Sequence, residues 1–206
     1  VNDAGNQIEK FGKSLNLRFM QICNGKGQAV IEKCSGNIQD ICETIYNDTE
    51  NFPMPEDVYL GMDIIEHAYN YFKENGSSLS SENEDIRKKT LTDFALPKNI
   101  AGLERDLAKY RITYDNWFKE STLHNDGSVN EIIQKLKASG YTYEQDGALW
   151  FKSSQLGDEK DRVLIRANGV VTYFVPDIAY HYNKLVTRGY DKAIDIFGAD
   201  HHGYIP

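Results

Sequence analysis

The stretch Thr172–Gly203 constrains the fold most, because it carries signals for a strand, a helix, a second strand and a glycine-rich turn, in that order. The residues of Val170–Val175 are mostly β-branched or aromatic, which favours a strand. Pro176 and Asp177 then favour the first turn of a helix. The apolar run Ala193–Phe197, which one Asp interrupts, predicts a second, mostly buried strand. This alternation of strands and helix predicts an α/β fold.

Three polar side chains follow the second predicted strand: Asp200, His201 and His202, between Gly198 and Gly203. Glycine lets the backbone approach a ligand closely and adopt unusual dihedral angles. Open α/β sheets bind their ligands outside the carboxyl ends of the strands. We therefore expect a ligand site at this turn.

Three interpretations of this polar turn are open. Its side chains can form a buried hydrogen-bonded network, they can bind a metal ion together with His181, or they can contact an organic ligand. Adjacent histidines rarely face one ion, and neither H-x-x-x-H nor H-E-x-x-H occurs in the sequence. We therefore expect no tightly bound metal.

Tyr173 and Asp177 are a second pair of candidates, four residues apart at the predicted strand-to-helix junction. There a phenol and a carboxylate can face one pocket. The alternatives are a strand aromatic for Tyr173 and a helix-start cap for Asp177, and both roles can coexist.

The first half of the chain predicts mainly helices. Apolar residues at helical spacing predict a helix after the turn at residues 2–5, a short helix over Asn37–Tyr46 and a longer one over Asp63–Asn75. Gly25-Lys-Gly27 lacks the spacing of a phosphate-binding loop and is interpreted as a surface turn. His67 is interpreted as an ordinary packing or surface residue.

A breaker divides the next helical region. Gly76–Asp85 is rich in Ser and Glu and predicts a flexible connection. Glu84–Leu96 and Ile100–Tyr110 predict two further helices, separated by Pro97.

The region before Thr172 predicts a small antiparallel meander. Ala148–Lys152, Arg162–Arg166 and Val170–Phe174 are three expected strands. Asn168-Gly169 is a strong hairpin turn between the last two, and Gly157–Asp161 is a charged loop between the first two.

Composition excludes several classes of protein. The 206 residues are 40% hydrophobic and 26% charged, as in globular proteins, and no apolar run is long enough to span a membrane. A net charge of −8 argues against a stand-alone nucleic-acid binder, which is usually basic. Three cysteines without metal spacing suggest reduced, idle thiols in a cytoplasmic protein, and no signal-peptide pattern stands at Val1.

Six segments, in the same order, give the chain a resemblance to the catalytic core of arginyl-tRNA synthetases, which are class I aminoacyl-tRNA synthetases. The resemblance extends over nearly the whole chain and is weakest over about residues 23–99. The segments are VNDAGNQI (Val1–Ile8), YDNWFKES (Tyr114–Ser121), YEQDGALWFKS (Tyr143–Ser153), GDEKDRVL (Gly157–Leu164), TYFVPDIAYHYNKL (Thr172–Leu185) and GADHHGY (Gly198–Tyr204).

The resemblance implies part of a Rossmann-type core made of residues 1–20 and 91–206, with a mostly helical connective insertion at residues 21–90 and the small antiparallel meander. The family's HIGH motif and KMSKS loop, which neutralise charge during catalysis, do not occur in the sequence. They would lie before Val1 and beyond Pro206, so we expect an incomplete catalytic domain that is inactive alone. Missing neighbour strands would also expose a sheet edge and favour self-association.

The resemblance also implies substrates and partners: arginine, ATP with Mg²⁺, and tRNA(Arg). In the family, residues matching Tyr173, Asp177 and His201 lie at the arginine, and residues matching Gly198 and Asp200 lie at the ATP. Two alternatives remain: a metal-dependent hydrolase built on Asp200 and the two adjacent histidines, and a non-catalytic module that binds a partner through the insertion.

Overall fold

The computed structural model describes residues 3–34 and 36–198. The chain divides between Trp117 and Phe118 into two compact units, each with its own hydrophobic core. Each unit is described by itself.

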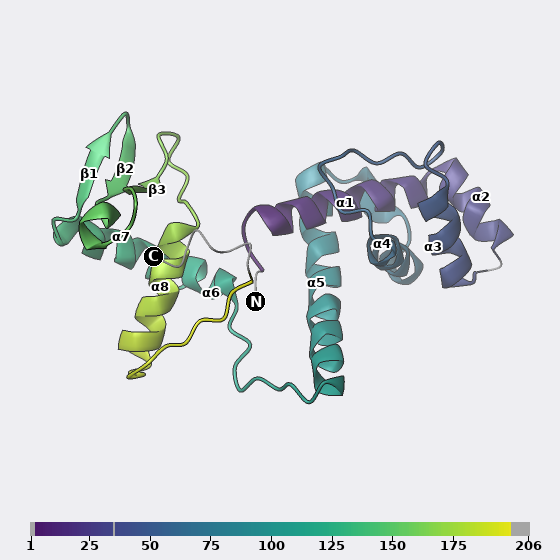
Figure 1. Cartoon of the computed structure of the whole chain (residues 1–206). Coiled ribbons are helices and arrows are strands. Elements are labelled where there is room, and N and C mark those ends of the chain that lie inside the picture. Colours follow the sequence, from purple (N-terminus) through teal and green to yellow (C-terminus); the bar gives the residue numbers. More distant parts are fainter. Residues whose placement is uncertain (1–2, 35, 199–206) are drawn as a thin grey trace. The chain divides into compact units, whose positions relative to one another are not determined.

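The first unit is helical within its described residues (Figure 1). Helix α1 packs against α4 and α5, and α3 packs against α4. The elements are α1 (Asn6–Cys23), α2 (Gly25–Lys33), α3 (Ile38–Asn47), α4 (Met62–Asn75), the 3-10 helix η1 (Ser78–Ser81) and α5 (Glu84–Lys109).

The core of the first unit follows the apolar spacing of the sequence. Apolar spacing predicts one face of α1 made of Ile8, Phe11, Leu15, Phe19 and Ile22; the last four are buried and Ile8 is half-buried. Residues from α3, α4 and α5 complete this core. The predicted helices over residues 37–46 and 63–75 are confirmed as α3 and α4. Because α1 to α5 share the core, packing alone does not set residues 21–90 apart, and their assignment as an insertion stays a prediction.

The prediction of a surface turn at Gly25–Gly27 is wrong, because these residues form the first turn of α2. Asn24 caps that helix: its side-chain oxygen accepts hydrogen bonds from the backbone N–H groups of Lys26 and Gly27, at 3.0 Å each. Gly27 is buried against α1, where the backbone of Gln21 leaves no room for a side chain. The glycine therefore serves helix packing.

The predicted break at Pro97 is also wrong, since α5 continues through it. The residues just after Pro97 are tied to α4: His67 Nε2 lies 2.6 Å from Asn99 Oδ1, and Lys98 Nζ lies 3.5 Å from Glu74 Oε1. These contacts offset the single backbone hydrogen bond that proline removes. His67 therefore has a defined partner on the neighbouring helix.

The segment predicted as a flexible connection has local structure. It contains η1, and Leu79 within it is buried in the core of the first unit. Asn83 caps α5 by accepting a hydrogen bond from the backbone N–H of Ile86, at 2.9 Å.

The second unit combines helices with a three-stranded antiparallel sheet of order β1-β2-β3. Asp146 and Gly147 join β1 to β2 with positive φ angles of 52° and 74°, as the two-residue turns of hairpins require. The elements are α6 (Glu120–Asn125), α7 (Ser128–Ala138), β1 (Thr142–Gln145), β2 (Ala148–Phe151), the 3-10 helix η2 (Ser153–Leu156), β3 (Arg162–Ile165), α8 (Phe174–Tyr182) and the π-helix η3 (Asn183–Thr187).

The α/β class and the small antiparallel meander are confirmed, whereas two predicted strands are wrong. Val170–Val175 contributes only a bridge between Val171 and Ile165 before α8 begins at Phe174. Ala193–Phe197 has no regular structure, because a strand needs a hydrogen-bonded neighbour and no strand of the described residues pairs with it. Among the helices of the described residues, none combines the length and the apolar character that crossing a bilayer requires.

Candidate functional site

The connection from β3 to α8 leads directly into the candidate residues Tyr173 and Asp177. The chain reverses at Asn168-Gly169, where Gly169 has a φ of 80° and Arg166 N donates to Val170 O at 2.9 Å. This confirms the predicted hairpin turn. Thr172 then returns to β3: its N–H donates to Leu164 O at 2.9 Å and its hydroxyl donates to Val163 O at 2.6 Å. The start of α8 is therefore anchored to the sheet on the residue before Tyr173.

Helix α8 has one buried and one exposed side. Val175 and Ala179 are buried in the core of the second unit, whereas Tyr173 and Asp177 are exposed. Residues four apart lie on the same face of a helix, and Asp177 N donates to Tyr173 O at 3.2 Å. The backbone thus places Tyr173 and Asp177 on one exposed face at the helix start, and their role as a binding pair stays a prediction.

The alternative role of Asp177 as the helix cap does not fit, because the cap position is Tyr173 and no side chain caps the helix there. Asp177 lies in the first turn of α8. The partial positive charge of a helix N-terminus stabilises an anion at this position. Sequence reasoning placed the helix start at Pro176, two residues later than observed.

A cluster that sequence reasoning missed lies one turn further along α8. His181 Nε2 lies 2.9 Å from Asp195 Oδ2, and Lys184 Nζ donates to Asp195 Oδ1 at 2.5 Å. His181 Nδ1 lies 2.9 Å from the backbone oxygen of Asp177. Asp195 belongs to the segment expected to be a buried strand, so its pairing with a helix residue 14 positions earlier had no local signal.

Asp195 is held in its ionised form. The hydrogen bond from Lys184, and then that from His181, lowers the pKa of the Asp195 carboxyl below its ordinary value of 3.8. The side chain of Lys184 is 13% exposed and its ammonium also lies 4.8 Å from the centre of the Tyr180 ring. The cluster is therefore a largely desolvated cation bound to a carboxylate beside a histidine.

The other predicted site residues have different outcomes. Gly198 is described and exposed, three residues after Asp195. Asp200, His201 and His202 lie outside the described residues, so their predicted roles stay predictions. Within residues 3–34 and 36–198, no group of three His, Cys, Asp or Glu side chains is placed to hold a metal ion.

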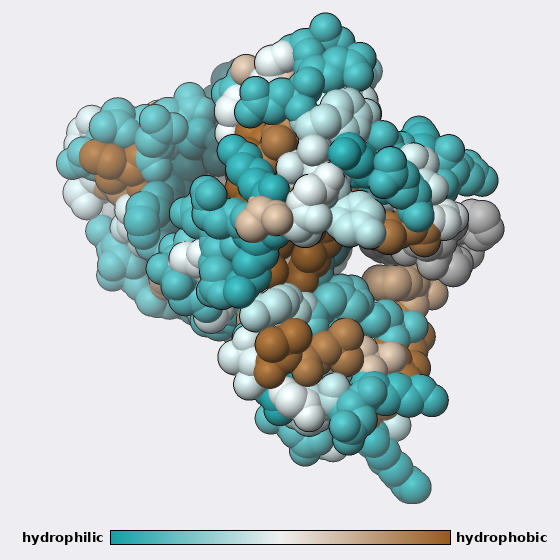
Figure 2. Space-filling model, turned by 90° about the vertical axis from the view of Figure 1, so that its left-hand side faces the viewer, coloured by the Kyte–Doolittle hydropathy of each residue, from teal (hydrophilic) through white to brown (hydrophobic). Residues whose placement is uncertain are grey.

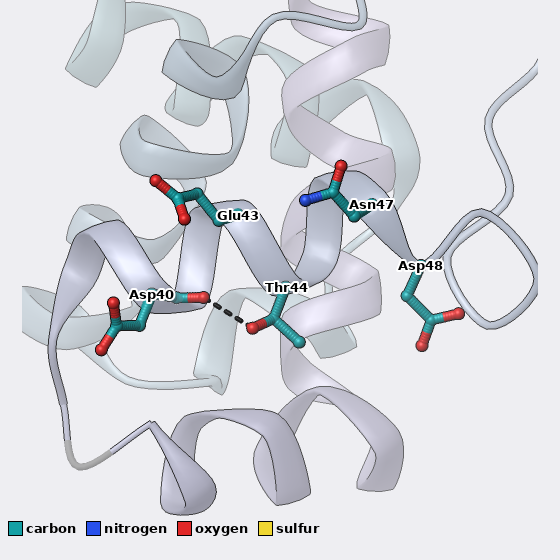
Figure 3. Close-up of a pocket in the computed structure, with 5 residues that line it drawn as sticks. All are labelled: Asp40, Glu43, Thr44, Asn47 and Asp48. Carbon is teal, nitrogen blue, oxygen red and sulfur yellow. Dashed lines mark hydrogen bonds between the residues drawn. The ribbon is translucent and has the colours of Figure 1, made fainter.

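A separate hollow on the first unit is acidic. Figure 3 shows its lining on α3 and at the end of that helix. Within α3 the Thr44 hydroxyl donates to Asp40 O at 2.7 Å. Asp48 accepts hydrogen bonds from Asn51, which lowers the pKa of its carboxyl. Glu43 accepts a hydrogen bond from Gln39 Nε2 of the same helix at 3.0 Å, and Asp40 is exposed. None of the candidate residues lines this hollow. Its lining is Asp40, Glu43, Thr44, Asn47 and Asp48.

Comparison with protein families identifies the class. Residues 11–205 match the family model described as "tRNA synthetases class I (R), catalytic domain". The chain therefore belongs to the class I tRNA synthetases, in the family marked R, the one-letter symbol for arginine. This membership agrees with the resemblance seen in the sequence and favours a synthetase over a metal-dependent hydrolase.

Individual relatives agree with the family. The chain is 46% identical over 204 residues to an arginine–tRNA ligase of Acetivibrio thermocellus, and 45% identical over 205 residues to one of Ruminiclostridium cellulolyticum. These matches cover 99% and 100% of this chain but 32% of each relative, so the chain spans about a third of their length. A solved structure from Campylobacter jejuni, assigned as an arginyl-tRNA synthetase, is similar with a TM-score of 0.68 at 30% identity, covering 100% of this chain and 47% of that one.

Proposed function

We propose that this chain forms part of an arginine–tRNA ligase. In the reaction of such a ligase, an oxygen of the arginine carboxylate attacks the α-phosphorus of ATP. The bond from that phosphorus to the bridging oxygen of pyrophosphate breaks. The products are arginyl-adenylate and pyrophosphate. The arginyl group then passes to a hydroxyl of the terminal adenosine of tRNA(Arg), releasing AMP.

The observation that carries this proposal is the exposed pair Tyr173 and Asp177 on one face at the start of α8. A guanidinium is planar and always charged, and its N–H groups form a fork that suits the two oxygens of a carboxylate. We assign Asp177 to this fork, with the Tyr173 hydroxyl as a neighbouring polar contact. Family membership supports arginine as the owner of the guanidinium.

We further assign the polar turn after Asp195 to the nucleotide and to the amino acid. Gly198 and Asp200 would contact ATP, with the Asp200 carboxylate accepting a hydrogen bond from a ribose hydroxyl, and His201 would contact arginine. ATP enters as its Mg²⁺ complex, and the ion neutralises phosphate charge. The chain's own residues thus bind and orient the two substrates, which is most of what adenylate formation requires of a protein.

A chimera tests this function with the chain's own residues in place. The 206 residues replace the matching segment of the Acetivibrio thermocellus ligase, to which they are 46% identical. We expect arginine-dependent exchange of pyrophosphate into ATP. In the chimera, Asp177→Asn should raise the KM for arginine about 50-fold, because it removes a charge-assisted hydrogen bond. Tyr173→Phe should raise it less.

Asp146→Asn is the matched control, since Asp146 is an exposed aspartate of the same unit, at a hairpin turn whose positive φ asparagine tolerates. An unchanged KM for arginine in Asp177→Asn, with normal activity, would remove Asp177 from the site. A wild-type chimera that exchanges with another amino acid instead of arginine would refute the proposed substrate.

We also propose that the 206-residue polypeptide alone does not catalyse the exchange, because its sequence has neither the HIGH nor the KMSKS motif. Exchange by that polypeptide in the presence of tRNA would contradict this. The cytoplasmic location and the self-association expected from the sequence stay predictions of the same proposal. Exposed Ile194, Ile196 and Phe197 support the second of these.

A further inference from the structure

The segment that precedes the polar turn is held by few features. After α8 and η3, Gly189 has a φ of 68°, and residues 189–198 form no regular secondary structure. Figure 2 shows hydrophobic residues reaching the surface in separate patches among hydrophilic ones. In this segment Ile194 and Ile196 are 74% and 93% exposed, so burial of apolar surface contributes little to its placement.

Asp195 is one point at which this segment meets α8 and η3, and the Tyr190 N–H, which donates to Lys184 O at 3.2 Å, is another. Its two carboxylate oxygens have different partners, the His181 ring 14 residues earlier and the Lys184 ammonium 11 residues earlier. A carboxylate with a different partner on each oxygen, one of them an ammonium, is fixed in direction as well as in distance. Lys184 is also the more buried member, so without Asp195 its charge would lack this anion in a poorly hydrated position.

The ring of His181 extends the connection to Asp177. Its Nδ1 faces a carbonyl oxygen and its Nε2 faces a carboxylate oxygen, and both of these are acceptors only. His181 Nε2 also lies 3.4 Å from Lys184 Nζ. The ring therefore links Asp195 and Lys184 to the backbone of Asp177.

We propose that Asp195 is a positioning residue, which fastens residues 190–198 to α8 through His181 and Lys184 and thereby holds Gly198 near the helix that carries Asp177. This inference rests on the proposed function, in which Gly198 belongs to the ATP site and Asp177 to the arginine site. It adds the residue that keeps the segment of Gly198 in place relative to the helix that carries Asp177. Asp195, His181 and Lys184 need not touch either substrate.

The fastening is measured first without substrates, on the full 206-residue chain. Hydrogen exchange followed by mass spectrometry should show Asp195→Asn exchanging about tenfold faster over residues 190–198, the effect of losing a hydrogen bond between charged groups. Lys184→Gln should show the same change. Lys192→Gln removes an equal charge from an exposed position of the same segment and should change nothing.

The positioning role is measured in the chimera. Asp195→Asn should raise the KM for ATP about tenfold, in keeping with the same lost hydrogen bond, while the KM for arginine changes less. Asp195→Glu, which keeps the carboxylate, should recover part of the loss. If Asp195 only stabilised the fold, Asp195→Asn would leave the KM values for ATP and arginine unchanged, and Asp195→Glu would have no loss to recover.

Each outcome decides one question. Unchanged exchange over residues 190–198 in both Asp195→Asn and Lys184→Gln overturns the fastening. Faster exchange with an unchanged KM for ATP overturns the positioning role. Faster exchange together with a wild-type chimera that ignores arginine refutes the proposed function and leaves the fastening established.

Discussion

Gly27 of α2 and Gln21 of α1 approach so closely that a Cβ atom on Gly27 would lie 2.2 Å from the backbone oxygen of Gln21. The nearest atoms beyond it are also backbone, the Cα and the oxygen of Ile22, each at 2.7 Å. A side-chain rotation cannot relieve such a contact, so α1 and α2 depend on this glycine for their spacing.

Gly27→Ala should therefore destabilise the chain by about 2 kcal/mol, within the range of overpacked cores. Helix propensity alone would make alanine the more stabilising residue at this position. A loss of stability in Gly27→Ala would therefore report the close packing. Urea denaturation measures the change. Gly25→Ala is the control, because nothing lies within 4 Å of its Cβ position. Equal effects of the two substitutions would contradict the close approach.

Pro97→Ala should stabilise the chain by about 2 kcal/mol, because Pro97 is exposed and lies inside a continuous helix. The gain is smaller than the full cost of proline, since proline also restricts the unfolded chain. Gly102→Ala in the same helix calibrates the measurement, with an expected gain of about 1 kcal/mol. A lower melting temperature for Pro97→Ala would mean that the proline ring itself makes a needed contact.

The thiols of Cys23 and Cys42 should resist alkylation. Burial raises the pKa of each to about 11, and Glu66 and Glu43 add to the effect at Cys42. At pH about 8 only roughly one thiol in a thousand is then the reactive thiolate. Iodoacetamide labelling followed by mass spectrometry should be slow in native protein and faster in urea, where the thiols regain their ordinary pKa. Fast native labelling of Cys42 would contradict its burial.

Acid should release the segment held by Asp195. The pKa of this carboxyl is lowered in the folded chain, chiefly by the hydrogen bond from Lys184 and then by His181. The contribution of the Asp195 carboxylate to holding residues 190–198 is therefore complete above its ordinary pKa of 3.8 and is lost as the pH falls below that value. Amide NMR shifts of Ile194 and Ile196 should follow this loss, and Asp195→Asn should remove the transition. A transition centred above pH 3.8 would mean that the pairing raises the pKa of the Asp195 carboxyl instead of lowering it.

Local sequence signals predicted the elements whose burial repeats along one face. Phe11, Leu15 and Phe19 indicated α1 because a helix brings every third or fourth residue to one side. The strand β1 was missed because Thr142–Gln145 is mostly polar and partly exposed. The following Asp146-Gly147 was the available signal, since this dipeptide is typical of hairpin turns.

Signals failed where distant contacts decide the outcome. Pro97 reads locally as a helix break, yet contacts of the following residues with α4 keep α5 continuous. The apolar run Ala193–Phe197 reads as a buried strand, yet no strand of the described residues pairs with it. The shared helix face of Tyr173 and Asp177 was predictable because both residues belong to one turn. The pairing of Asp195 was not, because its partners are 11 and 14 residues away.

The π-helix η3 (Asn183–Thr187) has a consequence for how this chain tolerates insertions and deletions. A π turn holds one residue more than an α turn, and one residue corresponds to about 100° of rotation around a helix axis. Deleting one residue there would allow an ordinary helix to continue, and everything downstream would leave it in a different direction. Homologous chains that shorten this turn by one residue must therefore redirect the polypeptide elsewhere, and length at this position is expected to vary less than amino-acid identity.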